Sequence, residues 1–242
     1  MKQITIILLS LIILSCSNND ENIADSNILS NYLYGKSIET GAVIACAANQ
    51  ENTNKILAFY YPKTGAINIS YYETQTAQVN KLDYSKYKKI ALESEPFFNG
   101  YLGKFTRAIE AENWIIITYE LNNEVKISNP IRTKHLQKPS VWNTNVTINL
   151  NEVLMPQFSW EANAVGNNSI YFQVVSNANN DLVSGTYTNE STFKFYDTSN
   201  VVLNITNGFP ELESNANYNF TLMDVSLDNW VNLVSEKEFN TQ

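Results

Sequence analysis

The chain has 242 residues, and 44% of them are hydrophobic, which is enough to build a buried core and excludes a wholly disordered protein. Its 24 acidic and 16 basic residues give a net charge of −8, which argues against nucleic acid as a partner, because binding a phosphate backbone requires a basic face. One histidine and two cysteines exclude a disulfide framework and a zinc site built from these residues alone.

The first sixteen residues have the pattern of a secretory signal. Lys2 gives a basic start, and residues 4–13 form an apolar run that is too short to span a membrane. The string Ile13-Leu14-Ser15-Cys16 resembles a bacterial lipobox. In that family the thiol is alkylated by diacylglycerol, and cleavage leaves the cysteine at the mature N-terminus. The resemblance implies a signal peptide over 1–15 and a lipid on Cys16 that anchors the protein in the bacterial outer membrane. An ordinary signal peptide with a chance cysteine is the alternative.

A polar, acidic segment follows the cysteine. Residues 17–26 read SNNDENIADS and contain little that a core would bury, so we predict a flexible tether over 16–30. The segment also resembles the export signals of surface-exposed lipoproteins in some Gram-negative lineages, which favours exposure at the cell surface. A plain spacer facing the periplasm is the alternative.

The next hundred residues are short β-type runs separated by Asn, Gly, Pro and Asp, without the 3.6-residue period of a long helix. Asn122-Asn123 predicts a tight hairpin between two of these runs, because asparagine tolerates the positive φ of a two-residue primed turn. Residues 81–92 fit one or two helical turns about as well as an edge strand. The strand candidates are 43–46, 55–61, 66–74, 101–107, 113–121 and 124–131.

Two prolines mark a break. Pro130 and Pro139 bracket the basic residues 131–137, which we predict to be an edge strand leading into an interdomain linker. We therefore expect one domain over 31–137 and a second over 138–242. The number of strands in the second domain is typical of an immunoglobulin-like sandwich. Its strand candidates are 146–150, 157–160, 169–176, 183–188, 192–196, 201–205, 217–224 and 230–239.

The second domain resembles fibronectin type III domains. Trp160 falls where that family has a core tryptophan on its second strand, and Tyr171 falls on the third. Leu212 and Tyr218 have the spacing of the family's tyrosine corner, whose phenol bonds back to the backbone. The first domain is less similar, since Trp114 occupies the place of the corner tyrosine. The predicted fold is therefore all-β, with two tandem immunoglobulin-like (fibronectin type III-like) β-sandwiches after a lipoprotein signal peptide and tether.

The rare reactive side chains are placed where packing would use them. His135 lies among Arg132, Lys134 and Lys138, which predicts a solvated linker histidine rather than a catalytic base. Cys46 follows the apolar Ile44 at a spacing of two, which predicts a buried thiol. We expect no cofactor and no metal.

Two pairs of acidic residues have a spacing that a hydrolase requires. Glu93/Glu95 and Glu110/Glu112 would each place carboxylates on one strand face about 7 Å apart, within the range of glycosidase pairs. Such pairs are common in acidic β proteins, so a glycoside hydrolase is the least favoured function. Asp224 and Asp228 flank a turn and suit calcium, but two carboxylates are too few to define a site.

Aromatic residues are the most suggestive feature for function. Phe97, Phe98 and Tyr101 lie among turn-forming residues, as does Trp230, which predicts exposed rings. Exposed rings stack on sugars or anchor protein partners, although burial inside the sandwiches is the alternative.

By analogy with surface glycan-binding lipoproteins of the starch-utilisation type, we predict a non-enzymatic, lipid-anchored envelope protein that binds a glycan or a protein partner beside an outer-membrane uptake complex. A structural spacer or assembly component of an envelope complex is the alternative.

Overall fold

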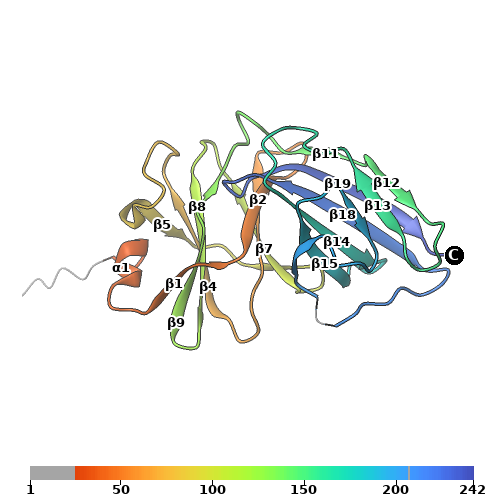
Figure 1. The fold of residues 1–242 in the computed structure, drawn as a ribbon. Helices are drawn as coiled ribbons and strands as arrows, with labels where there is room; N and C mark the ends of the chain where they lie inside the picture. Colours follow the sequence, from red (N-terminus) through yellow and green to blue (C-terminus); the bar gives the residue numbers. More distant parts are fainter. Residues whose placement is uncertain (1–24, 207) are drawn as a thin grey trace, which may run out of the picture.

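The computed structural model describes residues 25–206 and 208–242, so the predicted signal peptide, Cys16 and most of the predicted tether lie outside the described residues. The described chain is almost entirely β (Figure 1), with one short helix, α1 (Leu29–Leu33), and one 3-10 turn, η1 (Tyr84–Lys86). No helix in this part of the chain is long and apolar enough to cross a membrane.

The first sandwich consists of two sheets. Sheet 1 has the order β1 (Ile38–Val43), β9 (Glu124–Ser128), β8 (Trp114–Leu121), β4 (Ile67–Thr74) and β5 (Tyr87–Ile90), and β10 (Ile131–Arg132) also pairs with β8. Sheet 2 has the order β2 (Ala45–Asn49), β3 (Lys55–Tyr60), β7 (Leu102–Ala108) and β6 (Glu95–Phe97).

The second sandwich is built in the same way. Sheet 3 has the order β11 (Val141–Asn143), β19 (Val231–Asn240), β18 (Asn217–Val225), β14 (Ile170–Asn177), β15 (Leu182–Thr188) and β17 (Val201–Asn204). Sheet 4 has the order β12 (Val146–Asn149), β13 (Gln157–Trp160) and β16 (Thr192–Lys194).

The two sandwiches open with the same topology. In the first, β1 pairs in parallel with the late strand β9, and the chain then crosses to the other sheet, where β2 pairs antiparallel with β3. In the second, β11 pairs in parallel with β19, and β12 then pairs antiparallel with β13. The predicted fold class of two tandem immunoglobulin-like sandwiches is confirmed.

Local predictions in the first sandwich also hold. β8 and β9 form the expected hairpin, and Asn122 and Asn123 adopt φ values of 55° and 60°, as a primed turn requires. Residues 84–90 contain both predicted alternatives, because η1 leads directly into the edge strand β5. The packed structure starts slightly before the expected boundary at residue 31, since Leu29 in α1 is already fully buried.

The tyrosine corner of the second sandwich is present. The backbone N–H of Glu213 donates to Tyr218 Oη at 2.9 Å, and Leu212 and Tyr218 are both buried. In the first sandwich, Trp114 cannot accept such a bond, and its indole instead donates to the carbonyl of Ala77 at 3.1 Å. Trp114 therefore holds the β4–β5 connection against the start of β8 and does not form a tyrosine corner.

Sheet 2 is buried on both faces. Along β3, Ile56, Ala58 and Tyr60 belong to the core of the first sandwich. The alternating residues Leu57 and Phe59 belong to a different cluster, which also contains residues of sheet 3. Because side chains alternate across a strand, sheet 2 must be covered by sheet 1 on one side and by sheet 3 on the other.

Candidate functional site

The two sandwiches meet through an apolar interface. Cys46, Leu57 and Phe59 of sheet 2 form one buried cluster with Phe172 and Met223 of sheet 3. The faces in contact come from strands that the sequence assigns to separate domains. The expected linker therefore joins two sandwiches that share a core, instead of separating two independent bodies.

The four predicted binding aromatics lie at or near this interface. Phe98 is 7% exposed and Trp230 is 0% exposed, so the prediction that their rings project into solvent is wrong. Phe97 is half-buried against Phe59, with ring centroids 4.9 Å apart. Tyr101 is half-buried, and its hydroxyl donates to the carbonyl of Ile205 in the second sandwich. Turn-forming neighbours correctly predict loops, but these loops pack at the interface between the two sandwiches.

Trp230 is the most deeply inserted of these residues. It lies in the turn between β18 and β19 of the second sandwich, yet its ring is part of the core of the first. The backbone N–H of Ala47 donates to the carbonyl of Asn229 at 3.0 Å, and Ala47 forms a parallel bridge with Trp230. The indole N–H donates to the carbonyl of Lys138 at 2.9 Å. The N–H is the one polar group of the indole, so this buried side chain leaves no donor without a partner.

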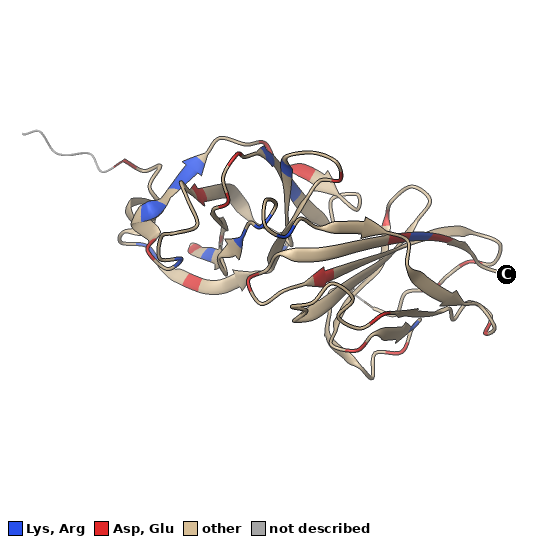
Figure 2. Cartoon of the chain, turned by 90° about the horizontal axis from the view of Figure 1, so that it is seen from above, with Lys and Arg blue, Asp and Glu red and all other residues tan. Residues whose placement is uncertain are grey.

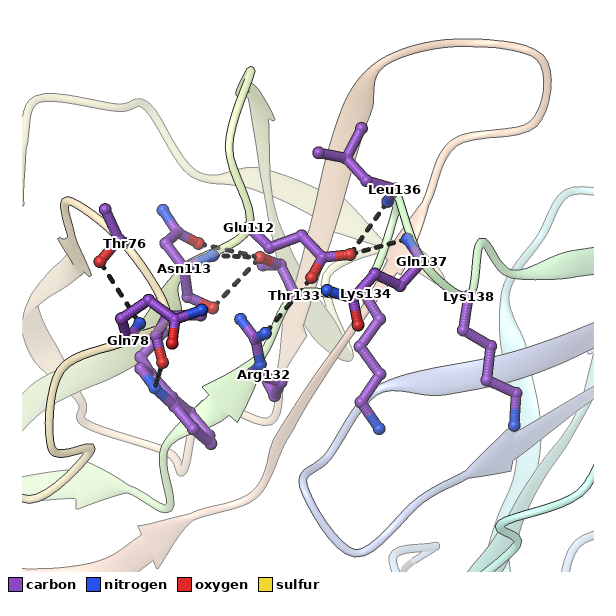
Figure 3. A network of polar contacts seen from close by, with 12 residues as sticks. Thr76, Gln78, Glu112, Asn113, Arg132, Thr133, Lys134, Leu136, Gln137 and Lys138 are labelled. Atoms are coloured by element: carbon purple, nitrogen blue, oxygen red, sulfur yellow. Dashed lines mark hydrogen bonds and ion pairs between the residues drawn. The ribbon is translucent and has the colours of Figure 1, made fainter.

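The segment between the sandwiches is held by Glu112 (Figure 3). This carboxylate is 8% exposed, and it accepts hydrogen bonds from the backbone N–H groups of Leu136 (3.1 Å) and Gln137 (2.9 Å). Arg132 donates to its second oxygen at 3.3 Å. Lys134 forms an ion pair with Asp228 of the second sandwich at 2.7 Å. These contacts make the segment an ordered part of the fold.

His135 belongs to the same segment, and the prediction that it is solvated is wrong. Its side chain is half-buried, and neither ring nitrogen has a hydrogen-bond partner among the described residues. Burial lowers the pKa of His135, and the nearby Glu112 carboxylate opposes that shift. A catalytic base must hydrogen-bond the nucleophile that it activates. Because neither ring nitrogen has such a partner in the described part of the chain, we assign His135 no role as a catalytic base.

Beside the interface, sheet 3 forms the floor of a groove of about 890 Å³. Three rows of side chains cross β14, β18 and β19 on the face that is turned toward sheet 2, and they change from apolar to polar. The rows are Phe172–Met223–Val234, Val174–Thr221–Glu236 and Ser176–Asn219–Glu238. The first row lies in the apolar interface, whereas Thr221, Glu236 and the whole third row line the groove.

The walls of the groove come from both sandwiches. Phe97 and Asn99 of the first sandwich line one part, and Trp142 on β11 lines another. The Trp142 indole is held in place because its N–H donates to the carbonyl of Asn49 at 3.0 Å. Trp142 and Glu51 also line a second, shallower hollow of about 700 Å³ beside His135. The groove therefore exists only when the two sandwiches are packed together.

The floor of the groove combines acidic and hydroxyl groups. Glu236 is exposed at the groove surface, and desolvation by the groove walls together with the neighbouring Glu51 carboxylate raises its pKa. Ser176 is 0% exposed, and within the described ranges its hydroxyl has no hydrogen-bond partner. A buried hydroxyl without a partner is costly, but because Ser176 is fully buried beneath the groove surface, a ligand in the groove does not reach it in this structure.

One member of each acidic pair considered for hydrolysis has a structural partner. Glu110 and Glu112 lie between β7 and β8 and not on a strand, and Glu112 holds the linker. Glu95 forms an ion pair with Lys104 at 3.1 Å. Cys46 is buried as predicted, and burial raises the pKa of its thiol to about 12, so it is not a nucleophile in the folded chain.

Asp224 and Asp228 each have partners within the protein. Asp224 accepts hydrogen bonds from the side-chain amides of Asn168 (3.1 Å) and Asn232 (3.2 Å), whereas Asp228 pairs with Lys134. Among residues 25–206 and 208–242, no group of three or more histidine, cysteine or acidic residues could hold a metal ion. We assign no metal to this turn.

Sequence reasoning missed Trp142 and Glu236 as groove residues. A signal was present on the last strand, where Val234, Glu236 and Glu238 share one face that changes from apolar to acidic. The same change occurs on β18, from Met223 to Thr221 and Asn219. When one face of a strand changes from apolar to polar halfway along, the layer that covers this face is expected to end at that point.

No protein-family model and no curated protein matches the chain. Among solved structures, the FN1–FN3 domains of chicken CNTN1 are similar over 86% of this chain and 68% of that chain, at 10% identity and a TM-score of 0.32. The chicken interferon gamma receptor alpha chain is similar over 82% of this chain and 96% of that chain, at 10% identity and a TM-score of 0.23. With TM-scores this low, the fold assignment rests on strand order and the tyrosine corner instead.

Proposed function

We propose that this chain is a non-enzymatic binding protein of the bacterial cell envelope, anchored in the outer membrane by a lipid on Cys16, and that it binds a glycan in the groove between the sandwiches. The observation that carries the proposal is the floor of the groove, where an apolar sheet face turns polar beneath an uncovered space. Sites of this kind combine a few fixed polar groups with apolar walls.

The side chains of the groove suit a sugar. Phe97 and Trp142 offer aromatic surface for stacking, and Glu236, Asn219 and Thr221 offer acceptors and donors for hydroxyl groups. The net charge of −8 favours a neutral or basic glycan over an acidic one. Rigid packing of the walls lowers the entropy that binding would otherwise cost.

The experiment is a screen of neutral and basic polysaccharides by affinity gel electrophoresis, followed by titration calorimetry with the best oligosaccharide. The chain starting at Ser17 is suitable, because it contains every described residue. Glu236→Gln is expected to weaken binding about tenfold, as loss of a hydrogen bond to a charged group predicts. Glu211→Gln, an exposed residue outside the groove, is the matched control and should bind normally. No retardation by any polysaccharide would contradict the proposal.

A structural or assembly role in an envelope complex is the second candidate. It is supported by β17, an edge strand of sheet 3 on which Val202 and Leu203 are 60% and 42% exposed. Such an edge can accept a strand from a partner protein. Recovery of one stoichiometric envelope protein in a cross-linked pull-down, lost in Val202→Lys and kept in Glu236→Gln, would favour this candidate.

A further inference from the structure

Four lysines gather at the end of the molecule where the described chain begins. Lys81, Lys86, Lys88 and Lys89 on η1, β5 and the preceding turn, here called the lysine patch, are all exposed. Because side chains alternate along a strand, Lys88 and Lys89 leave opposite faces of β5, and the patch wraps around this edge of sheet 1. They are a quarter of the 16 basic residues in a chain of net charge −8. None of them forms an ion pair within the described residues, where seven other basic residues do. Figure 2 shows basic residues on the strand next to the start of the described chain.

The neighbouring acidic residues have other partners. Glu73 lies opposite Lys88 on β4, but its carboxylate binds Arg107 at 2.8 Å. Asp83 caps η1 by accepting hydrogen bonds from the backbone N–H and the hydroxyl of Ser85, and its negative charge remains beside Lys86. The positive charge of the patch is therefore not neutralised by a fixed ion pair in the described structure.

The start of the folded chain is fixed directly onto this patch. The backbone N–H of Lys89 donates to the carbonyl of Asn27 at 2.7 Å, and Ile28 forms an antiparallel bridge with Lys88. Leu29 and Leu33 of α1 are then buried against Tyr72 and Tyr87. Any segment that precedes Asp25 must leave the fold beside the lysines.

That geometry limits how far the patch can lie from a lipid anchor. Residues 16–25 span at most about 30 Å when fully extended. A lipid on Cys16 would hold the patch within that distance of the bilayer and give it a high effective concentration there. This step rests on the lipid anchor of the proposed function, but not on the groove or on glycan binding.

We propose that the lysine patch docks on the anionic phospholipid headgroups of the bilayer that carries the anchor. Lysines beside an anionic surface are attracted to it, and the attraction is screened within a Debye length. Leu82, which is 62% exposed, lies within the patch and can enter the headgroup region. Docking would hold the first sandwich at the membrane and the second farther out, since the C-terminus lies at the opposite end (Figure 1).

The first experiment uses the lipid-bearing protein in vesicles of phosphatidylcholine alone or mixed equally with phosphatidylglycerol. Lysines are labelled with an amine-reactive reagent and quantified by mass spectrometry. In anionic vesicles, labelling of the patch is expected to fall about threefold or more, and the protection is lost in high salt because the attraction is screened. Lys55 at the start of β3 and Lys63 in the loop after it are both exposed, so they are the internal controls and should label equally in both. Equal labelling of the patch in both vesicles would overturn the proposal.

The second experiment separates failure of the anchor from failure of the patch. The chain starting at Ser17 is sedimented with anionic vesicles at low salt, where it should bind measurably. Lys88→Glu with Lys89→Glu should reduce the bound fraction at least threefold, whereas Lys55→Glu with Lys63→Glu, which makes the same change in charge, should reduce it much less. Equal losses in both variants, or no binding at all, would overturn the proposal.

The acidic residues Asp20 and Glu21 of the tether are the competing occupant of the patch. If vesicle binding occurs only after Asp20→Asn with Glu21→Gln, the tether itself covers the lysines and the membrane proposal is wrong. If the double variant binds as the parent chain does, the tether is excluded as the occupant and the proposal is supported.

Discussion

Trp230 of the second sandwich and Ala47 of the first form a parallel β-bridge, and the indole of Trp230 is fully buried in the core of the first sandwich. Each sandwich is therefore incomplete without the other. The contact holds the two halves against each other, and the candidate groove beside it has walls from both. It also makes the stability of the two halves interdependent.

Replacement of Trp230 by alanine should destabilise the whole chain. Removing a fully buried indole leaves a large cavity, and truncations of this kind cost about 3–5 kcal/mol. Urea unfolding followed by circular dichroism measures the change. Tyr34→Ala is the control, because Tyr34 is 90% exposed and should change stability by less than about 0.5 kcal/mol. A loss below about 1 kcal/mol in Trp230→Ala would contradict the role assigned to this residue.

Tyr218→Phe should weaken the second sandwich through the tyrosine corner alone. The variant keeps the ring but leaves the N–H of Glu213 without its acceptor, which costs about 1 kcal/mol. The free energy of unfolding from urea titration provides the test, with Tyr34→Phe as the matched control. Identical stability in the two variants would show that the corner bond contributes nothing.

Glu120 should make the first sandwich sensitive to acid. Its carboxylate accepts hydrogen bonds from Tyr32 (2.6 Å), Asn68 (2.8 Å) and Lys36 (3.0 Å), which lower the pKa of Glu120 to about 2 from an ordinary value of 4.5. Because the folded-state pKa is depressed, the stabilisation is complete above pH 4.5 and is lost as the pH falls toward 2.

Thermal unfolding of Glu120→Gln between pH 6 and pH 2 tests that assignment. The parent chain should lose more stability than the variant across the window from about pH 4.5 to 2, so the two curves converge in acid. Glu211→Gln, which changes an exposed carboxylate, should follow the parent. If stability falls with pH in parallel for Glu120→Gln and the parent, the lowered pKa assigned to Glu120 is contradicted.

Glu236 should have the opposite effect to Glu120 on how stability depends on pH. Desolvation in the groove and the Glu51 carboxylate raise the pKa of Glu236, so the folded state holds the proton more tightly than the unfolded state. The parent chain then loses stability as the pH rises through the raised pKa, and Glu236→Gln should be at least as stable as the parent at pH 7. Urea unfolding at pH 7 and at pH 4 measures this. If Glu236→Gln instead loses stability relative to the parent when the pH is raised from 4 to 7, Glu236 is stabilised as a carboxylate and the assigned direction of its pKa shift is wrong.

Much of the fold could be predicted because it depends on local chemistry. The Asn122-Asn123 turn and the spacing of Leu212 and Tyr218 each determine a backbone geometry within a few residues. Burial of Cys46 could be predicted for the same reason, from alternation along one strand. None of these features depends on how the two sandwiches meet.

The arrangement of the sandwiches depends on contacts between distant segments, and the sequence contains only half of that information. The run Ile56–Tyr60 is continuously apolar, which is typical of a strand covered on both faces. The pattern does not identify the second covering layer. For that reason the sequence predicts exposed rings in the β6–β7 and β18–β19 turns, whereas Phe98 lies in a cluster with residues of the second sandwich and Trp230 lies in the core of the first.

The most direct test of the shared core is the reactivity of Cys46, which lies between sheets 2 and 3. In the chain starting at Ser17 it is the sole thiol, and its raised pKa and burial should prevent labelling while the sandwiches are packed. Pulse labelling with a thiol reagent across a urea series should show Cys46 reacting in a single transition that coincides with global unfolding. Labelling at urea concentrations where both sandwiches are still folded would show that they separate, and would contradict the account.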